Sequence, residues 1–144
     1  MRHVRRGGLR LAGAPDGLPG RSPVNAILWW LQALFCCAYL VHAAVHAFPP
    51  AALRRRLDAE DRPGLRLTAN LTEALGGFGL VLPGLLHTAT WLTPASAAGL
   101  FLLMCGAVAF HVTRREHAPA MLPAVLAVGL AFLTYERGFA YPLA

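Results

Sequence analysis

The stretch NAILWWLQALFCCAYLVHAAVHAF, Asn25–Phe48, runs without a single Asp, Glu, Lys or Arg. The hydrocarbon core of a bilayer is about 30 Å thick, and a helix needs roughly 20 predominantly apolar residues to cross it. Asn25–Phe48 is long enough for one crossing, and Pro49-Pro50 ends it because proline cannot continue helical hydrogen bonding. The stretch therefore predicts a transmembrane helix over 24–48.

Two further stretches lack charged residues, one between Glu73 and Arg114 and one between Glu116 and Glu136. The first is long enough for two crossings and is interrupted in the middle by prolines. The second is short but sufficient for one crossing at about 1.5 Å per residue. We therefore expect an all-α integral membrane four-helix bundle, with helices at about 24–48, 67–86, 93–112 and 119–136.

The overall composition points the same way. Of the 144 residues, 56% are hydrophobic and only 14% are charged, and the mean hydropathy is +0.50. A soluble domain carries roughly 25% charged residues, and a small domain needs a mostly polar surface because its surface is large relative to its volume. The composition therefore argues against a soluble globular enzyme.

The basic residues are distributed as in a membrane protein. All thirteen are arginine, the net charge is +6, and they lie in the N-terminal segment and between the apolar stretches. Residues 1–23, rich in Gly, Pro and Arg, predict a disordered basic tail. Since no recognition motif accompanies the charge, we expect no nucleic-acid partner and anionic lipid head groups instead. Six arginines lie on the side of the termini and seven on the other, so the count indicates no orientation.

Several local signals mark where the helices begin and how they pack. Ser22-Pro23 and Thr93-Pro94 have the pattern of an N-cap followed by proline at the first helical position. Pro119 opens the last helix, and Pro83-Gly84 predicts a kink or stop. Residues 51–66 carry five arginines and three acids, and their middle predicts a short amphipathic helix on the membrane interface. Small residues that would let helices approach closely are Gly76, Gly77, Gly79, Ala95, Gly99 and Gly106.

Polar side chains within the apolar helices gather near one membrane face. Four crossings place the ends of the first and third helices and the start of the second on the same side. The residues that this brings within a few turns of one face are His42, His46, Asn70, Glu73 and His111. Because polar groups inside a membrane are costly, such a cluster is a candidate ligand-binding site.

The residue types leave several uses of this cluster open. It suits a small polar or quinone-like ligand, and imidazoles with one carboxylate also suit a divalent metal. Facing histidines in a bundle can hold haem, and the cluster can equally be a network that only locks helices together. The chain has no His-Glu-x-x-His metal motif and no Cys-x-x-Cys redox motif. We find no catalytic motif and expect no activity from the chain alone.

Five motifs together resemble the DoxX-like family of small membrane proteins. Glu73–Pro83, EALGGFGLVLP, is similar to the family segment Glu-Leu-Leu-Gly-x-x-Gly-Leu-x-Leu-Pro. The resemblance continues, in family order, through Leu92–Leu100, Met104–His111, Arg114-Arg115-Glu116 and a closing Tyr135-Glu136-Arg137, where the family has Tyr-Gly-Arg. It covers roughly Asn25–Phe139, and we expect one such domain over 24–139.

The resemblance implies a four-helix bundle in the cytoplasmic membrane of a bacterium. Some members of the family are associated with quinone-linked sulfur oxidation and others with oxidative-stress membrane complexes. The family often has Gly-x-x-Lys at the end of its first helix, where this chain has Ala43-Ala44-Val45-His46. If the family lysine pairs with the acid of the second helix, His46 with Glu73 would be a pH-sensitive substitute.

These observations predict a non-catalytic subunit or ligand-binding partner of a quinone-linked redox membrane complex. An alternative is an electron-transfer protein that holds a quinone, metal or haem at the cluster. A second alternative is a purely structural or assembly protein. On any of these interpretations, we expect the protein to lie in the lipid bilayer and to contact either a redox subunit or a second copy of the chain.

Overall fold

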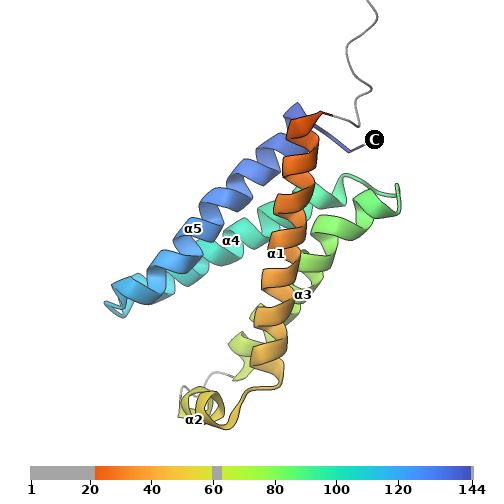
Figure 1. Ribbon diagram of the computed structural model, residues 1–144. Coiled ribbons are helices and arrows are strands. Elements are labelled where there is room, and N and C mark those ends of the chain that lie inside the picture. Colours follow the sequence, from red (N-terminus) through yellow and green to blue (C-terminus); the bar gives the residue numbers. More distant parts are fainter. Residues whose placement is uncertain (1–21, 60–62, 144) are drawn as a thin grey trace, which may run out of the picture.

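The computed structural model describes residues 22–59 and 63–143. Every element in these residues is helical, which confirms the all-α prediction (Figure 1). The elements are α1 (Pro23–Ala47), α2 (Ala51–Ala59), α3 (Pro63–Leu85), α4 (Leu92–Thr113), α5 (His117–Tyr135) and a π-helical turn η1 (Glu136–Ala140). The predicted basic tail lies, except for its last two residues, outside the described residues.

The beginning of α1 follows the sequence signal. The Ser22 side-chain oxygen accepts a hydrogen bond from the Asn25 backbone N–H at 3.1 Å, and Pro23 occupies the first helical position. Ser22 therefore satisfies one of the backbone donors that a helix N-terminus leaves unpaired. The short helix predicted between the first two crossings is also present, as α2.

Three predicted helix starts differ from the structure. Helix α3 begins at Pro63 and not near Leu67. Helix α4 begins at Leu92, one residue before the expected cap, and Thr93 is fully buried inside its first turn with no hydrogen-bond partner for its hydroxyl. Helix α5 begins at His117, so Pro119 lies within the first turn and does not open the helix. Proline is tolerated there because the first turn has no intrahelical acceptor for its N–H.

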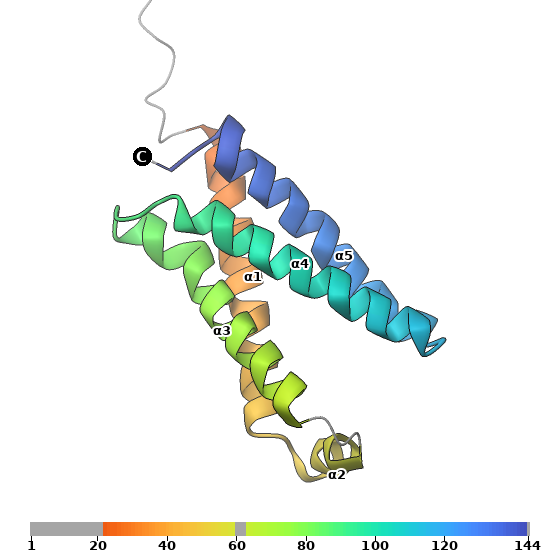
Figure 2. The ribbon, with the colours of Figure 1, turned by 180° about the vertical axis from the view of Figure 1, so that it is seen from behind.

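The four long helices form two pairs that meet at one end and diverge at the other (Figures 1 and 2). Helix α1 packs along α3, α4 packs along α5, and α3 joins the pairs by packing against α4. The start of α1 and the end of α5 lie together at the closed end. At the open end, the ends of α1 and α4 stand apart in both views.

The core lies where the two pairs meet. Its fully buried apolar side chains come from all four long helices and include Leu28, Leu80, Leu100 and Leu130. Gly79 faces Ser96 across the α3–α4 contact so closely that a β-carbon at Gly79 would overlap the serine side chain.

The predicted close approach at the small residues of α4 is wrong. A β-carbon at Gly99 or Gly106 would meet nothing within 4 Å. Helix α4 instead approaches its neighbours through a different face, which contains the fully buried Ala97.

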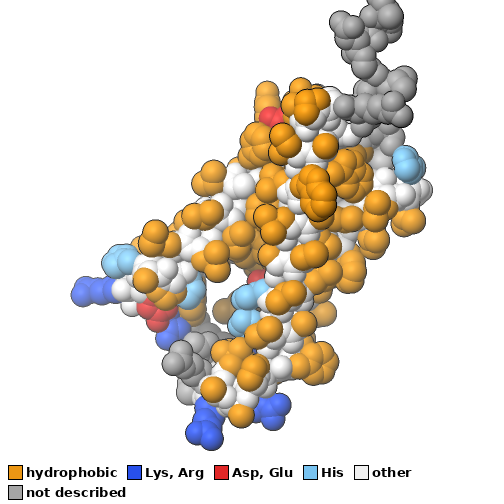
Figure 3. All heavy atoms as spheres, in the orientation of Figure 1, with side chains coloured by type: hydrophobic (Ala, Val, Ile, Leu, Met, Phe, Trp, Pro, Cys, Tyr) orange, Lys and Arg blue, Asp and Glu red, His pale blue; other side chains and the backbone are white. Residues whose placement is uncertain are grey.

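The outer surface of the helices is apolar. On α1, Ile27, Trp30, Leu34 and Val41 follow a helical spacing and are between 62% and 77% exposed. A stripe of large apolar side chains with no covering partner is typical of helices that face lipid. Orange apolar side chains cover most of the visible helix surface in Figure 3.

Among the described residues, three helices are long and apolar enough to cross a membrane: α1, α4, and α5 continued by η1. Helix α3 has 23 residues, which is sufficient length, but it carries Arg66, Asn70 and Glu73 in its first half. The chain is therefore a small helical membrane protein, and the fourth crossing stays a prediction.

Candidate functional site

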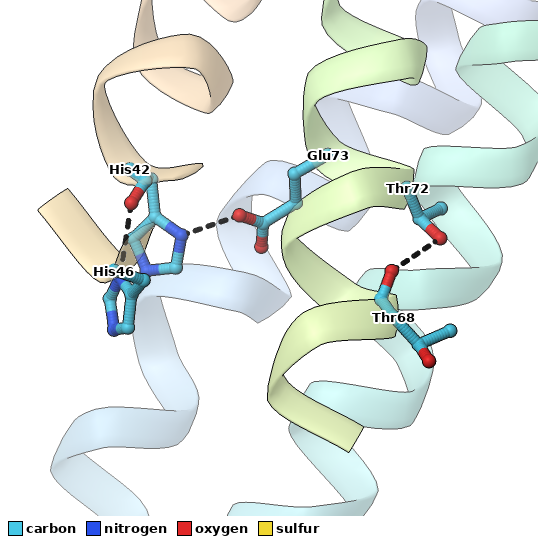
Figure 4. Close-up of polar contacts among 5 residues, drawn as sticks. All are labelled: His42, His46, Thr68, Thr72 and Glu73. Atoms are coloured by element: carbon cyan, nitrogen blue, oxygen red, sulfur yellow. Dashed lines mark hydrogen bonds and ion pairs between the residues drawn. The ribbon is translucent and has the colours of Figure 1, made fainter. Parts of the chain in front are cut away.

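The open end of the α1–α3 pair contains an ionisable pair that joins the two helices. His42 Nδ1 of α1 lies 2.6 Å from Glu73 Oε2 of α3 (Figure 4). The Glu73 side chain is 6% exposed, whereas that of His42 is 54% exposed. A buried carboxylate thus holds a histidine whose other ring edge is accessible, which is how a carboxylate orients an imidazole at many functional sites.

His46 stacks against His42 one turn further along α1. The two ring centroids are 4.1 Å apart, and His46 Nδ1 lies 3.0 Å from the His42 carbonyl oxygen (Figure 4). Because a carbonyl only accepts hydrogen bonds, His46 Nδ1 carries the proton. In the neutral ring, His46 Nε2 is therefore left as an acceptor.

This arrangement corrects the expected pairing of Glu73. The family resemblance suggested His46 as its partner, but the structure places His42 there and leaves His46 hydrogen-bonded within its own helix. Both histidines are on one face of α1, so their spacing alone did not distinguish them.

A cavity of about 510 Å³ lies between α1 and α3 beside these histidines. Three of its lining side chains are polar, namely His46, Arg66 and Asn70, and all the others are leucine or alanine. We call this cavity the α1–α3 groove. Arg66 and the Asn70 amide supply hydrogen-bond donors, so the groove combines an apolar wall with a few donors, as ligand pockets commonly do.

His111 is not part of this cluster. Its Nδ1 lies 2.8 Å from Glu116 Oε2, and Arg114 Nε lies 3.5 Å from the other oxygen of the same carboxylate. Helix α4 packs against α3 and α5 but not against α1, and its end diverges from that of α1 (Figure 2). The structure therefore brings together four of the predicted residues at the contact between α1 and α3, namely His42, His46, Asn70 and Glu73. His111 is paired with Glu116 instead.

These positions give little support to the metal and haem alternatives. Among the residues that the structure describes, no three His, Cys, Asp or Glu side chains are grouped as metal ligands would be. His42 and His46 stack on each other and do not face one another across a space for a porphyrin.

Sequence reasoning missed a second polar cluster at the closed end of the molecule. Arg137 in η1 is only 2% exposed, and its Nε donates to Gln32 Oε1 at 2.6 Å. Its Nη1 donates to Asn25 Oδ1 at 2.6 Å and to the Tyr141 carbonyl at 3.2 Å. Gln32 in turn donates to the Leu80 carbonyl at 2.5 Å, so one network ties the end of the chain to α1 and α3.

One signal in the sequence could have revealed this network. Gln32 is a strongly polar residue within the apolar stretch of the first helix, where an unpaired amide would be costly. Such a residue needs a partner, and Arg137 follows the last apolar stretch at the same membrane side. The guanidinium also lies 5.6 Å from the Trp29 ring centroid, within cation–π range.

Comparison with known proteins agrees with this architecture. No curated protein and no solved structure matches the chain. A model of the DoxX-like family matches residues 30–133, a range that contains the α1–α3 groove, His42 and Glu73 but not Arg137. The chain belongs to the DoxX-like family.

Proposed function

We propose that this membrane protein has no activity on its own and is a ligand-binding subunit of a quinone-linked redox complex in a bacterial cytoplasmic membrane. Its ligand would be the head group of a quinone-class amphiphile, bound in the α1–α3 groove. The observation that supports this proposal is the mixed lining of the groove, where His46, Arg66 and Asn70 interrupt a wall of leucine and alanine.

The chemistry of the groove suits such a head group. A quinone ring is flat and apolar, and its carbonyl oxygens only accept hydrogen bonds. Arg66 and the Asn70 amide can donate to these oxygens, while Ala43, Ala44 and Ala47 leave room for a flat ring. The groove lies near one end of α1 and α3, so the ring would sit close to the membrane interface with its apolar tail toward the lipid.

The His42–Glu73 pair gives the site a way to handle protons. A quinone takes up two protons and two electrons when it becomes a quinol, and the electrons would come from the partner subunit. His46 lines the groove and stacks on His42, which is bonded to Glu73. Both rings have Nδ1 engaged, so each presents Nε2 as a position that can accept or return a proton.

A second candidate function is purely structural. The His42–Glu73 bond joins α1 to α3, and a buried hydrogen-bonded pair of this kind can fix how two helices pack in a membrane. On this alternative the pair contributes to stability and the groove is filled by lipid.

Titration of the full-length protein in dodecyl maltoside with decylubiquinone separates the two candidates. We expect saturable binding, which Arg66→Gln and Asn70→Leu each weaken about fivefold, because a hydrogen bond to the head group contributes about 1 kcal/mol. Arg114→Gln is the matched control, since it removes an arginine at the end of α4 and should leave binding unchanged.

The proposal is wrong if decylubiquinone does not saturate the protein, or if both groove variants bind as tightly as the unmodified chain. If Glu73→Gln lowers the unfolding temperature while quinone binding is absent, the structural candidate is supported instead.

A further inference from the structure

Helix α2 packs against no other helix in the part of the chain that the structure describes. It lies beyond the ends of α1 and α3, at the open end of the molecule (Figures 1 and 2). A nine-residue helix is marginal in water without a surface to pack on. Packing against the described helices therefore does not account for the stability of α2.

The two sides of α2 differ in chemistry. Leu53 and Leu57 are four residues apart, share one face and are partly buried. Arg54 and Arg55 are exposed. A short helix with an apolar face and arginines beside it is suited to lie in the plane of a membrane surface, with the leucines toward the acyl chains.

Arginines outnumber acids around α2. Residues 51–66 contain five arginines and three acids. Arg114 and Arg115 follow α4 at the same open end of the molecule. Figure 3 shows the blue basic side chains at the far tips of the two helix pairs and none on the apolar flanks between them. This positively charged open end of the molecule complements anionic lipid head groups.

We propose that α2 lies flat in the head-group layer and binds anionic phospholipids through Arg54 and Arg55. The planar guanidinium matches the oxygens of a phosphate and can donate two parallel hydrogen bonds to it. A second copy of the chain fits this surface less well, because it would place arginine against arginine. The inference is independent of the quinone proposal, since neither Arg54 nor Arg55 lines the α1–α3 groove.

Hydrogen exchange of the α2 backbone amides tests this inference on the full-length protein in nanodiscs. We compare nanodiscs of phosphatidylcholine alone with nanodiscs that contain 30% phosphatidylglycerol, and the expected result is exchange about tenfold slower in the anionic lipid. Arg54→Gln/Arg55→Gln should abolish this difference. Arg114→Gln/Arg115→Gln, which removes the same charge at the end of α4, should preserve it.

Two further exchange measurements identify the ligand. Inorganic phosphate added to phosphatidylcholine nanodiscs should not slow exchange, because the leucine face requires a lipid surface. Leu53→Ser/Leu57→Ser should speed exchange in both lipids. Equal exchange of the unmodified protein in the two lipids, or full protection by phosphate alone, would overturn the inference.

Discussion

His42 Nδ1 and Glu73 Oε2 are 2.6 Å apart, and this contact links the end of α1 to the middle of α3 through one nearly buried carboxylate. The acid is shielded from solvent, but the imidazole that it holds remains half exposed. An interhelical bond between these partners has two consequences. It stabilises the α1–α3 packing, and it fixes which ring nitrogen of His42 is presented outward.

Removing this carboxylate should destabilise the protein. Glu73→Ala leaves His42 without its charged partner, and we expect a loss of about 1.5–3 kcal/mol in the free energy of unfolding. Glu116→Ala is the matched control, because Glu116 also pairs with a histidine but its side chain is 39% exposed. We expect the control to lose less than about 1 kcal/mol. Thermal unfolding in detergent measures both, and equal losses would contradict the importance of burial.

The Arg137 network should behave as a unit. Gln32→Leu leaves the Arg137 Nε–H buried without its acceptor, so we expect a loss of about 1.5–3 kcal/mol. The double variant Gln32→Leu/Arg137→Met replaces both groups with apolar ones and should recover much of that loss. A double-mutant cycle on unfolding free energies checks this prediction. Strictly additive losses would show that the two side chains act separately.

The α3–α4 contact should be sensitive to volume at Gly79. Gly79→Ala places a methyl group where the Ser96 side chain lies, and we expect a loss of about 1–3 kcal/mol from overpacking. Gly99→Ala adds the same methyl group in open space, so its stability should be unchanged or higher by up to about 1 kcal/mol. If the two variants unfold at the same temperature, the helices do not approach at Gly79 as described.

The helices were predictable because bilayer thickness and the cost of charge in lipid act on local sequence. Charge-free stretches therefore predicted α1, α4 and α5, and the Ser22-Pro23 signal predicted where α1 begins. The Thr93-Pro94 signal did not mark the helix start, because α4 begins at Leu92. Thr93 therefore lies inside the helix, and its side chain is buried in the bundle.

The candidate site was predictable only in part. Sequence spacing shows which residues share a face of one helix, but the rotation of α1 against α3 decides that His42, and not His46, meets Glu73. His111 pairs with a nearby residue and not with the cluster. Arg115 has a positive φ of 60°, and this turn brings the Glu116 carboxylate back to the His111 ring. From the sequence alone, Arg137 is only one of the arginines on the side of the termini, but the π-helical turn η1 buries it in the bundle.

The crossing of α3 decides whether the groove, α2 and the His42–Glu73 pair lie at one membrane face, opposite the termini. In a chain whose three native cysteines are replaced by alanine, single cysteines at Ala52, Thr88 and Thr113 are probed in sealed vesicles with a membrane-impermeant maleimide. All three positions are exposed. Four crossings predict that Ala52 and Thr113 are labelled from one side and Thr88 from the other. Labelling of Ala52 and Thr88 from the same side would contradict the four-crossing arrangement.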